Sequence, residues 1–371
     1  MISLSSMKKY FLALIIVLIS LPSMASGDNV SGEKIMRGTV ETVLEEGTST
    51  NGIEPTQYQI LEVEIKDVES GGSETVRINH GVIFPITDAQ KVTQGDAVVV
   101  SRVESDDGIQ YFIIDSYRLP ALLLLFGFFF VVTIMVAGKR GVTSLLGLAF
   151  SIGAIGVFIV PQIIDGKNPF VISIIGAGII AVASLYLAHG FNARTTVALA
   201  GTLISLFIAA VFSIIFSSIG KVIGMGNEDA FFLEQFGPID PSNLRGLLLG
   251  GIIIGTLGVL DDITVSQSAA VYELKKANSS LSFGKLYSHG MAIGREHIAS
   301  LVNTLALAYA GAALPLFIIF GLNADAPFWL ALNNQAIAEE VVRTLVGSLS
   351  LVLAVPITTL LASWHATRGV L

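Results

Sequence analysis

The chain has 371 residues, of which 53% are apolar and only 13% are charged. A soluble domain averages about a quarter charged residues, so this composition excludes an ordinary water-soluble globule and a disordered chain and indicates several membrane spans. The net charge is −8 without a basic block, which argues against nucleic acid as a partner. The absence of cysteine excludes disulfides, zinc fingers and a thiol nucleophile.

Residues 1–26 have the features of a secretory signal peptide. Lys8 and Lys9 form a positive end, residues 10–20 form an apolar stretch, and Ser23-Met24-Ala25 is a small-x-small cleavage site. The apolar stretch is short for a span, which favours cleavage over a retained anchor. In both cases the residues that follow are exported.

Residues 30–118 are predicted to form a separate, extracytoplasmic β-rich domain. Apolar and polar residues alternate over five segments, with glycine and aspartate at the turns between them: 36–44, 58–68, 74–79, 96–103 and 110–117. This pattern predicts a small OB-like β-barrel, with a β-sandwich fragment as the alternative. Residues 27–118 carry seven basic and seventeen acidic side chains, so the basic face with which OB barrels bind nucleic acid is missing.

Residues 119–371 are predicted to form an all-α bundle of seven transmembrane helices. Each apolar run is close to the roughly 20 residues that a helix needs to span a bilayer, and backbone groups in lipid must pair within their own helix. The predicted spans are 119–137, 142–163, 170–188, 195–219, 244–263, 298–321 and 341–363. Residues 264–297, between the fifth and sixth spans, are predicted to be a cytoplasmic amphipathic segment.

The placement of lysine and arginine predicts the orientation, because these residues concentrate in cytoplasmic loops. With the β-domain outside, eight of them fall in inner loops: Lys139, Arg140, Arg194, Lys275, Lys276, Lys285, Arg295 and Arg368. After the first span, the outer loops and their edges hold four: Lys167, Lys221, Arg245 and Arg343. The C-terminus is then cytoplasmic, and the signal peptide independently predicts the same orientation.

The fifth predicted span is rich in glycine and ends in two carboxylates. The glycines are predicted to form a flat strip for close helix packing, since several of them are spaced by four: Gly246, Gly250, Gly251, Gly255 and Gly258. Asp261, Thr264 and Ser268 follow at helical spacing on one face, with Asp262 on a neighbouring face. A carboxylate is costly in hydrocarbon, by about 2.5–3.5 kcal/mol at the centre of a span.

We interpret these residues as a candidate ion or substrate site. Asn303 and Thr304 enter the next span at the same membrane level, so the candidate set is Asp261, Asp262, Thr264, Ser268, Asn303 and Thr304. The alternative is that Asp261 and Asp262 only cap a helix or meet the water interface. Adjacent aspartates point about 100° apart, which argues against an intramembrane aspartyl protease.

The sequence predicts no enzyme, no catalytic residue, no metal site and no cofactor. No phosphate-binding glycine loop and no G-x-S-x-G motif is present. His289, Glu296 and His297 are the only candidates for a metal-dependent enzyme acting on lipid. Their spacing of seven and eight residues exceeds the i, i+4 spacing of two histidines on one helix, so an amphipathic surface helix is favoured.

The signal peptide, the acidic β-domain and the sequence GTLGVLDDITVSQSAAVYEL at residues 255–274 together resemble the bacterial YibE/F family of multi-pass membrane proteins. GREHIASLVNTLALAYAGAALPL at residues 294–316 is similar to that family too. The resemblance extends from about residue 37 to the C-terminus and implies a bacterial inner-membrane topology. It implies no substrate, cofactor or catalytic residue.

Two functions remain open from the sequence. The first is a transporter or permease for an ion or small solute that uses Asp261 and Asp262, with the β-domain as an outer lid or docking module. The second is a non-transporting scaffold or signalling protein that binds a protein partner through the β-domain. The lipid bilayer is the expected environment in both, and the sequence sets neither the oligomeric state nor the substrate.

Overall fold

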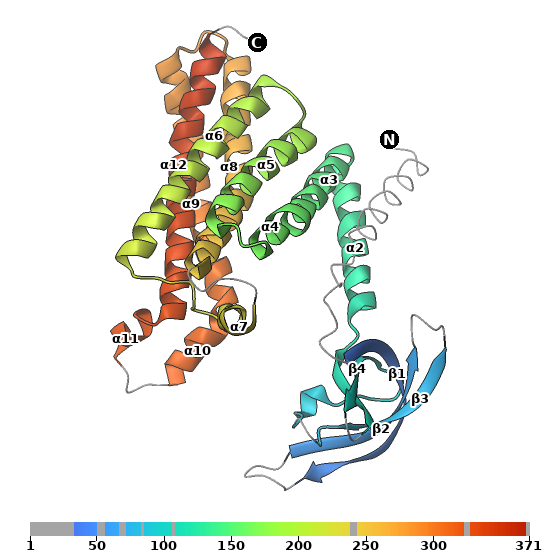
Figure 1. Cartoon of the computed structure of the whole chain (residues 1–371). Coiled ribbons are helices and arrows are strands. Elements are labelled where there is room, and N and C mark those ends of the chain that lie inside the picture. Colours follow the sequence, from blue (N-terminus) through green and yellow to red (C-terminus); the bar gives the residue numbers. More distant parts are fainter. Residues whose placement is uncertain are drawn as a thin grey trace. The chain divides into compact units, whose positions relative to one another are not determined.

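The computed structural model describes residues 33–49, 56–66, 72–82, 85–105, 108–237, 243–322 and 327–368 (Figure 1). They fall into two compact units that divide between residues 133 and 134, inside helix α2 (Leu119–Ala137). The predicted signal peptide, residues 1–26, lies outside the described residues.

The first unit is a five-stranded antiparallel sheet in the order β3-β2-β1-β4-β5. Its strands, each drawn as an arrow in Figure 1, are β1 (Glu33–Ser49), β2 (Thr56–Lys66), β3 (Ser73–His80), β4 (Ala97–Ser105) and β5 (Gly108–Ser116). Each of the five predicted strand segments overlaps one of them. The alternating pattern therefore predicted the N-terminal sheet correctly.

Strand β1 is long and bent, and it joins the two halves of the sheet. Its first residues pair with β4 and most of its length pairs with β2, with register shifts after Val40 and Val43. Such bulges bend a strand and increase its twist. A Cβ at Gly38 would lie 2.6 Å from Cγ1 of Val63, so only glycine allows this close approach. The alternating inward residues form the core, which includes Val40, Leu61, Val63, Val98 and Val100.

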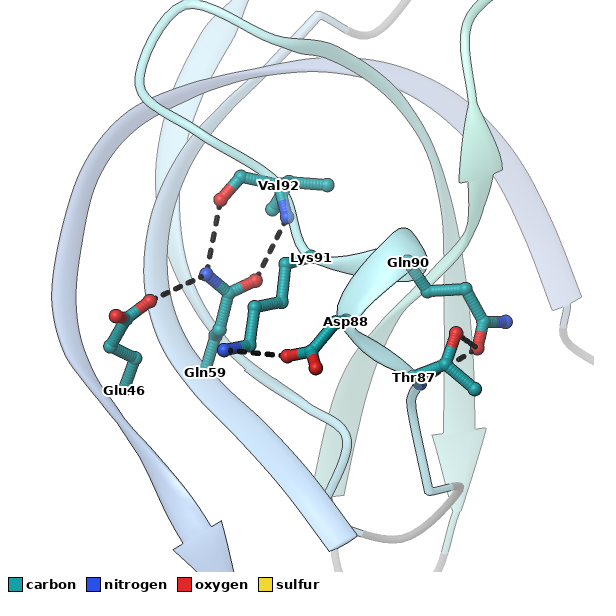
Figure 2. A network of polar contacts seen from close by, with 7 residues as sticks. All are labelled: Glu46, Gln59, Thr87, Asp88, Gln90, Lys91 and Val92. Carbon is teal, nitrogen blue, oxygen red and sulfur yellow. Dashed lines mark hydrogen bonds and ion pairs between the residues drawn. The ribbon is translucent and has the colours of Figure 1, made fainter.

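Gln59 is a buried polar residue in this unit and holds the connection between β3 and β4. Its side-chain Nε2 donates to the carbonyl of Val92 (3.1 Å), and its Oε1 accepts from the Val92 amide (2.9 Å), as Figure 2 shows. Nε2 also lies 3.4 Å from Oε2 of Glu46. The same connection carries a one-turn helix η1 (Asp88–Gln90), whose capping box joins Thr87 and Gln90. The Gln59 side chain thereby satisfies the backbone carbonyl and amide of Val92, which are not paired within a strand.

We expect Gln59→Leu to destabilise this connection by about 1–3 kcal/mol, because the Val92 amide and carbonyl would stay buried without partners. The measurement is hydrogen exchange of the full-length protein in detergent, with faster exchange over residues 87–93. Gln94→Leu is the control, because Gln94 is exposed in the same connection. Unchanged exchange in Gln59→Leu would contradict this role.

The second unit is helical and accounts for the rest of the described chain. After α2 come α3 (Lys139–Ala154), a π-helical segment η2 (Ile155–Ile159) and α4 (Val160–Ile164). The remaining helices are α5 (Pro169–His189), α6 (Ala193–Ile219), α7 (Glu228–Phe236), α8 (Leu244–Ala277), α9 (Phe283–Ala312), α10 (Leu314–Leu322), α11 (Phe328–Leu332) and α12 (Gln335–Thr367). Figure 1 shows α7, α10 and α11 at the end of this unit away from the C-terminus.

Six helices in the described part of the chain are long and apolar enough to cross a membrane: α2, the α3–α4 segment, α5, α6, α8 and α12. Each contains or coincides with most of one predicted span. The predicted span at 298–321 is not one helix, because α9 ends at Ala312 and α10 begins at Leu314. Pro315 explains the break, since it has no N–H to donate and restricts the residue before it. Seven spans are therefore not found among the described residues.

Helices α6, α8 and α12 pack together, with α5 and α9 beside them (Figure 1). Apolar side chains fill much of the space between them, among them Leu206, Ile253, Leu260 and Leu351. Residues 264–297, predicted as a cytoplasmic amphipathic segment, form the end of α8, a turn and the first half of α9. Gly290 and Gly294 of α9 are buried in this packing.

Candidate functional site

Asp261 lies on α8 and is half-buried beside α5 and α6. The hydroxyl of Ser184 on α5 donates to its Oδ2 at 3.1 Å. Its other carboxylate oxygen, Oδ1, is buried and makes no hydrogen bond of normal geometry, although the Thr202 side chain on α6 lies close enough to interact with the carboxyl group. A buried carboxylate oxygen without a donor is costly, which makes this atom a candidate for binding a cation or a proton.

Asp262 is exposed, although it directly follows Asp261. One residue on a helix turns the side-chain direction by about 100°, so the two aspartates leave α8 on different sides. The carbonyl of Asp262 accepts from Ser266 (2.7 Å) one turn later. The structure therefore separates the two carboxylates into one enclosed and one exposed group.

Thr264 and Ser268 are fully buried on the same side of α8 as Asp261. The Thr264 hydroxyl lies 2.7 Å from the hydroxyl of Thr202 on α6. Ser268 donates to the carbonyl of Arg194 at the start of α6 (2.9 Å). The spacing of Asp261, Thr264 and Ser268 thus places three polar side chains against α5 and α6.

Asn303 and Thr304 lie elsewhere. Both are exposed on α9, and Thr304 donates to the carbonyl of Ser300 in its own helix (3.1 Å). In the described part of the chain, neither side chain is hydrogen-bonded to Asp261. The structure therefore does not bring these two members of the predicted set to Asp261.

The glycines of α8 divide into two groups. A Cβ at Gly250 would overlap the hydroxyl of Ser173 on α5, and a Cβ at Gly246 would lie 3.3 Å from Pro169. A Cβ at Gly255 would lie 3.1 Å from the Tyr309 hydroxyl on α9. At Gly251 and Gly258 an added Cβ would meet no atom of the described chain within 4 Å. The close approach of α8 therefore runs along Gly246 and Gly250 toward α5.

Several buried polar residues extend the site beyond the predicted set. Gln267 of α8 is fully buried, and its Nε2 donates to the carbonyl of Gly290 on α9 (2.8 Å) and to the hydroxyl of Thr359 on α12 (2.7 Å). Its Oε1 is buried without a partner, as are the hydroxyls of three serine and threonine residues in α6 and α12: Ser205, Thr358 and Ser363. Polar side chains from three central helices therefore share the bundle interior.

A histidine to which the sequence assigned no role lies at the end of this polar region. Tyr272 of α8 and His365 of α12 are joined by a 2.7 Å hydrogen bond between the tyrosine hydroxyl and Nδ1 of the imidazole. Tyr272 is buried, whereas His365 is half-buried. By contrast, His289 and Glu296 are exposed on α9 and His297 is half-buried. The described residues contain no group of three or more His, Asp or Glu side chains placed to hold a metal.

The β-unit has a cavity of its own, with a volume of about 620 Å³. Its polar lining contains no carboxylate, lysine or arginine and comes from the end of β3, the β3–β4 connection, β4 and β5: Asn79, His80, Gln90, Ser101 and Gln110. Ile86, Ile113 and Ile114 supply apolar lining. A cavity of this size and mixed lining is in the range of ligand pockets.

The family of the chain is shown by its helical part. A family model described as YibE/F-like protein matches residues 125–368. The match contains both segments on which the resemblance was based, and it leaves the β-unit outside. No curated protein and no solved structure matches the chain. Because the match covers more than half of the chain, and because six described helices are long and apolar enough to cross a bilayer, the protein is a membrane protein that belongs to the YibE/F-like family.

Proposed function

We propose that the protein is a transporter or permease for a cation or a proton, with Asp261 as the binding group. The observation that carries this proposal is the enclosed carboxylate of Asp261, whose Oδ1 is buried without a hydrogen-bond partner. A carboxylate oxygen that is buried inside a membrane bundle without a hydrogen bond is expensive unless it binds a proton or a cation. The hydroxyls of Ser184, Thr202 and Thr264 lie on the helices around it.

In this proposal the β-unit is an OB-like domain outside the cytoplasm of a bacterial cell, and the C-terminus is cytoplasmic. The strand order β3-β2-β1-β4-β5, with long bent β1 at its centre, supports the OB-like assignment. Six of the eight basic residues expected in inner loops lie near the ends of α3, α6, α8 and α9: Lys139, Arg140, Arg194, Lys275, Lys276 and Lys285. The protein would act without a catalytic residue or cofactor.

A second proposal is a scaffold that binds a protein partner through the β-unit. Two observations favour it. The side chains of Thr264 and Ser268 are fully buried, and the cavity of the β-unit is lined by amide side chains. In this case the buried polar residues would serve helix pairing alone. The two proposals differ in whether water reaches the interior of the bundle.

The lack of cysteine in the chain makes this difference measurable. Single cysteines replace Thr264 and Ser268, and a membrane-impermeant thiol reagent is added from either side of oriented vesicles. For a transporter we expect labelling from both sides, in different states of the protein. Ser279→Cys, at an exposed position in the turn between α8 and α9, serves as the reactive reference. Complete protection of Thr264→Cys and Ser268→Cys under all gradients would reject the transport proposal and favour the scaffold.

A further inference from the structure

We propose that the species bound at Asp261 is a proton, and that it reaches Asp261 along a row of buried hydroxyls that begins at the Tyr272–His365 pair. This inference rests on the proposed function and names its substrate. Besides Thr202 and Thr264, which lie near Asp261, it uses polar residues of α8 and α12 outside the candidate ion site.

The row begins where the bundle meets solvent. His365 is half-buried, and its Nδ1 is occupied by the hydrogen bond to the Tyr272 hydroxyl at 2.7 Å. Tyr272 is only 8% exposed. The imidazole therefore connects a partly exposed position to a hydroxyl inside the bundle, which is the geometry of a proton entry group.

The row continues along the buried face of α12. Ser363, Thr359 and Thr358 are all fully buried, and they lie within two helical turns. The hydroxyls of Ser363 and Thr358 have no partner, so each can accept and donate a hydrogen bond. The Thr359 hydroxyl donates to the Val355 carbonyl (2.6 Å) and accepts from Gln267 (2.7 Å).

The last part of the row crosses from α12 to α6 and α8. Gly201 brings α6 against Thr358, because a Cβ at this glycine would overlap the threonine hydroxyl. The next residue, Thr202, shares a 2.7 Å hydrogen bond with Thr264, which is one turn from Asp261 on α8. Two steps are hydrogen bonds, from Tyr272 to His365 and from Thr202 to Thr264. Ser363 to Thr359 and Thr264 to Asp261 are each about one helical turn, and Thr358 lies next to Thr359 and against Gly201. The step from His365 to Ser363, two residues away on α12, is bridged by water in this proposal.

The extended shape of this row favours a proton over a metal ion. From Asp261 to Tyr272 the polar positions cover eleven residues of α8, or about 16 Å along the axis. A metal cation needs several oxygens that converge on one point. A proton needs only a chain of hydroxyls, in which each oxygen accepts one proton and passes on its own.

The transfer balances at each step. A proton from solvent binds Nε2 of His365, and the Nδ1 proton passes to the Tyr272 oxygen as that hydroxyl releases its own. The buried hydroxyls, with water between those that have free hydrogen-bonding capacity, repeat the exchange. One proton finally forms an O–H bond with the Asp261 carboxylate, which becomes a neutral acid. One proton has entered and one has arrived. Each hydroxyl again carries one proton, and His365 is left with its proton on Nε2 instead of Nδ1.

The test uses the full-length protein in vesicles that contain a pH-sensitive dye. A pH gradient is imposed, and we expect the wild type to dissipate it. Tyr272→Phe, Thr358→Val and Ser363→Ala should each slow dissipation by at least about tenfold, since each breaks the row at one hydroxyl. Ser300→Ala, an exposed hydroxyl on α9, should stay within about twofold of the wild type. Thermal melting in detergent verifies that every variant is folded.

The outcomes separate this inference from the proposed function. A wild type that carries Na⁺ or K⁺ but leaves the pH gradient intact would overturn the proton assignment and keep the transport function. A wild type that carries no ion at all would overturn both. Folded Tyr272→Phe, Thr358→Val and Ser363→Ala proteins that all dissipate the gradient at the wild-type rate would overturn the row as the path.

An infrared measurement tests the end of the row without transport. A protonated carboxyl group gives a C=O stretching band that a carboxylate lacks. We expect this band in the wild type, its loss in Asp261→Asn and its retention in Asp262→Asn. If the wild-type and Asp261→Asn spectra are the same in this region, no proton resides on Asp261.

Discussion

Asp261→Asn is expected to lower the flux of protons or cations through the reconstituted protein by about a hundredfold or more. The amide cannot take up a proton or balance a cation, and the loss of an interaction of about 3 kcal/mol corresponds to a rate or affinity change of that size. The amide keeps the volume of the carboxylate and can accept the Ser184 hydrogen bond. The bundle should therefore stay folded. The measurement is dye-reported flux into vesicles at matched protein density.

The comparison is Asp262→Asn, which removes the same charge one residue away. Because Asp262 is exposed, its replacement should change flux by less than about twofold. Equal loss of flux in both variants would mean that charge at this end of α8 matters and that the enclosure of Asp261 does not. Full flux in Asp261→Asn would remove the carboxylate from the mechanism.

Gly250→Leu is expected to disrupt the contact between α8 and α5. A Cβ at this position would overlap the Ser173 hydroxyl and lie 3.3 Å from the carbonyl oxygen of Pro169, so the backbones would have to separate. Overpacking of this kind costs about 1–3 kcal/mol, and here two helices must move. We expect a clear fall in the melting temperature in detergent and a lower yield of folded protein.

Gly258→Leu is the matched control on the same helix. An added Cβ there meets no atom of the described chain within 4 Å, and leucine has a better helix propensity than glycine by about 1 kcal/mol. Its melting temperature should equal or exceed that of the wild type. A similar fall in both variants would show that glycine matters to α8 through its backbone and not through the contact with α5.

The sequence predicts the sheet and most spans well because their signals are local. Alternation of apolar and polar residues locates all five strands, since one face of each strand fills the core. The apolar run that ends at Ala137 predicts α2 with its observed bounds, and most of its side chains are exposed, as expected for a helix facing lipid. The bulges in β1 carry no comparable signal, because they depend on pairing with two different strands.

The prediction of one continuous helix over residues 298–321 is not confirmed, for a reason that lies partly in the sequence. Pro315 interrupts the apolar run and signals a helix start. A span is nevertheless predicted, because the run of apolar residues is long enough to cross a bilayer. Tertiary packing also contributes. Gly290 and Gly294 pack α9 against Gln267 and α12, so α9 joins the bundle well before residue 298, where the predicted span begins.

The candidate site is predicted only on α8. Helical spacing correctly places Asp261, Thr264 and Ser268 on one face, but spacing cannot state which face meets other helices. Ser184 and Gln267 were missed because single polar residues in apolar helices are not specific. A weak signal exists in α12, where Thr359, Ser363 and Thr367 recur every four residues and so define one polar stripe.

The unequal lengths of the helices have an electrical consequence. Helix α5 has 21 residues, about 31 Å, and matches a hydrocarbon core of about 30 Å, whereas α8 has 34 residues and is about 51 Å long. Ser184 places Asp261 within the length of α5, while Tyr272 and His365 lie beyond the contact of Ser268 with the start of α6. The membrane voltage falls almost entirely across hydrocarbon, at about 2.3 kcal/mol per charge for each 100 mV. In the proposed transporter, uptake of a proton or cation at Asp261 would therefore be biased by that voltage.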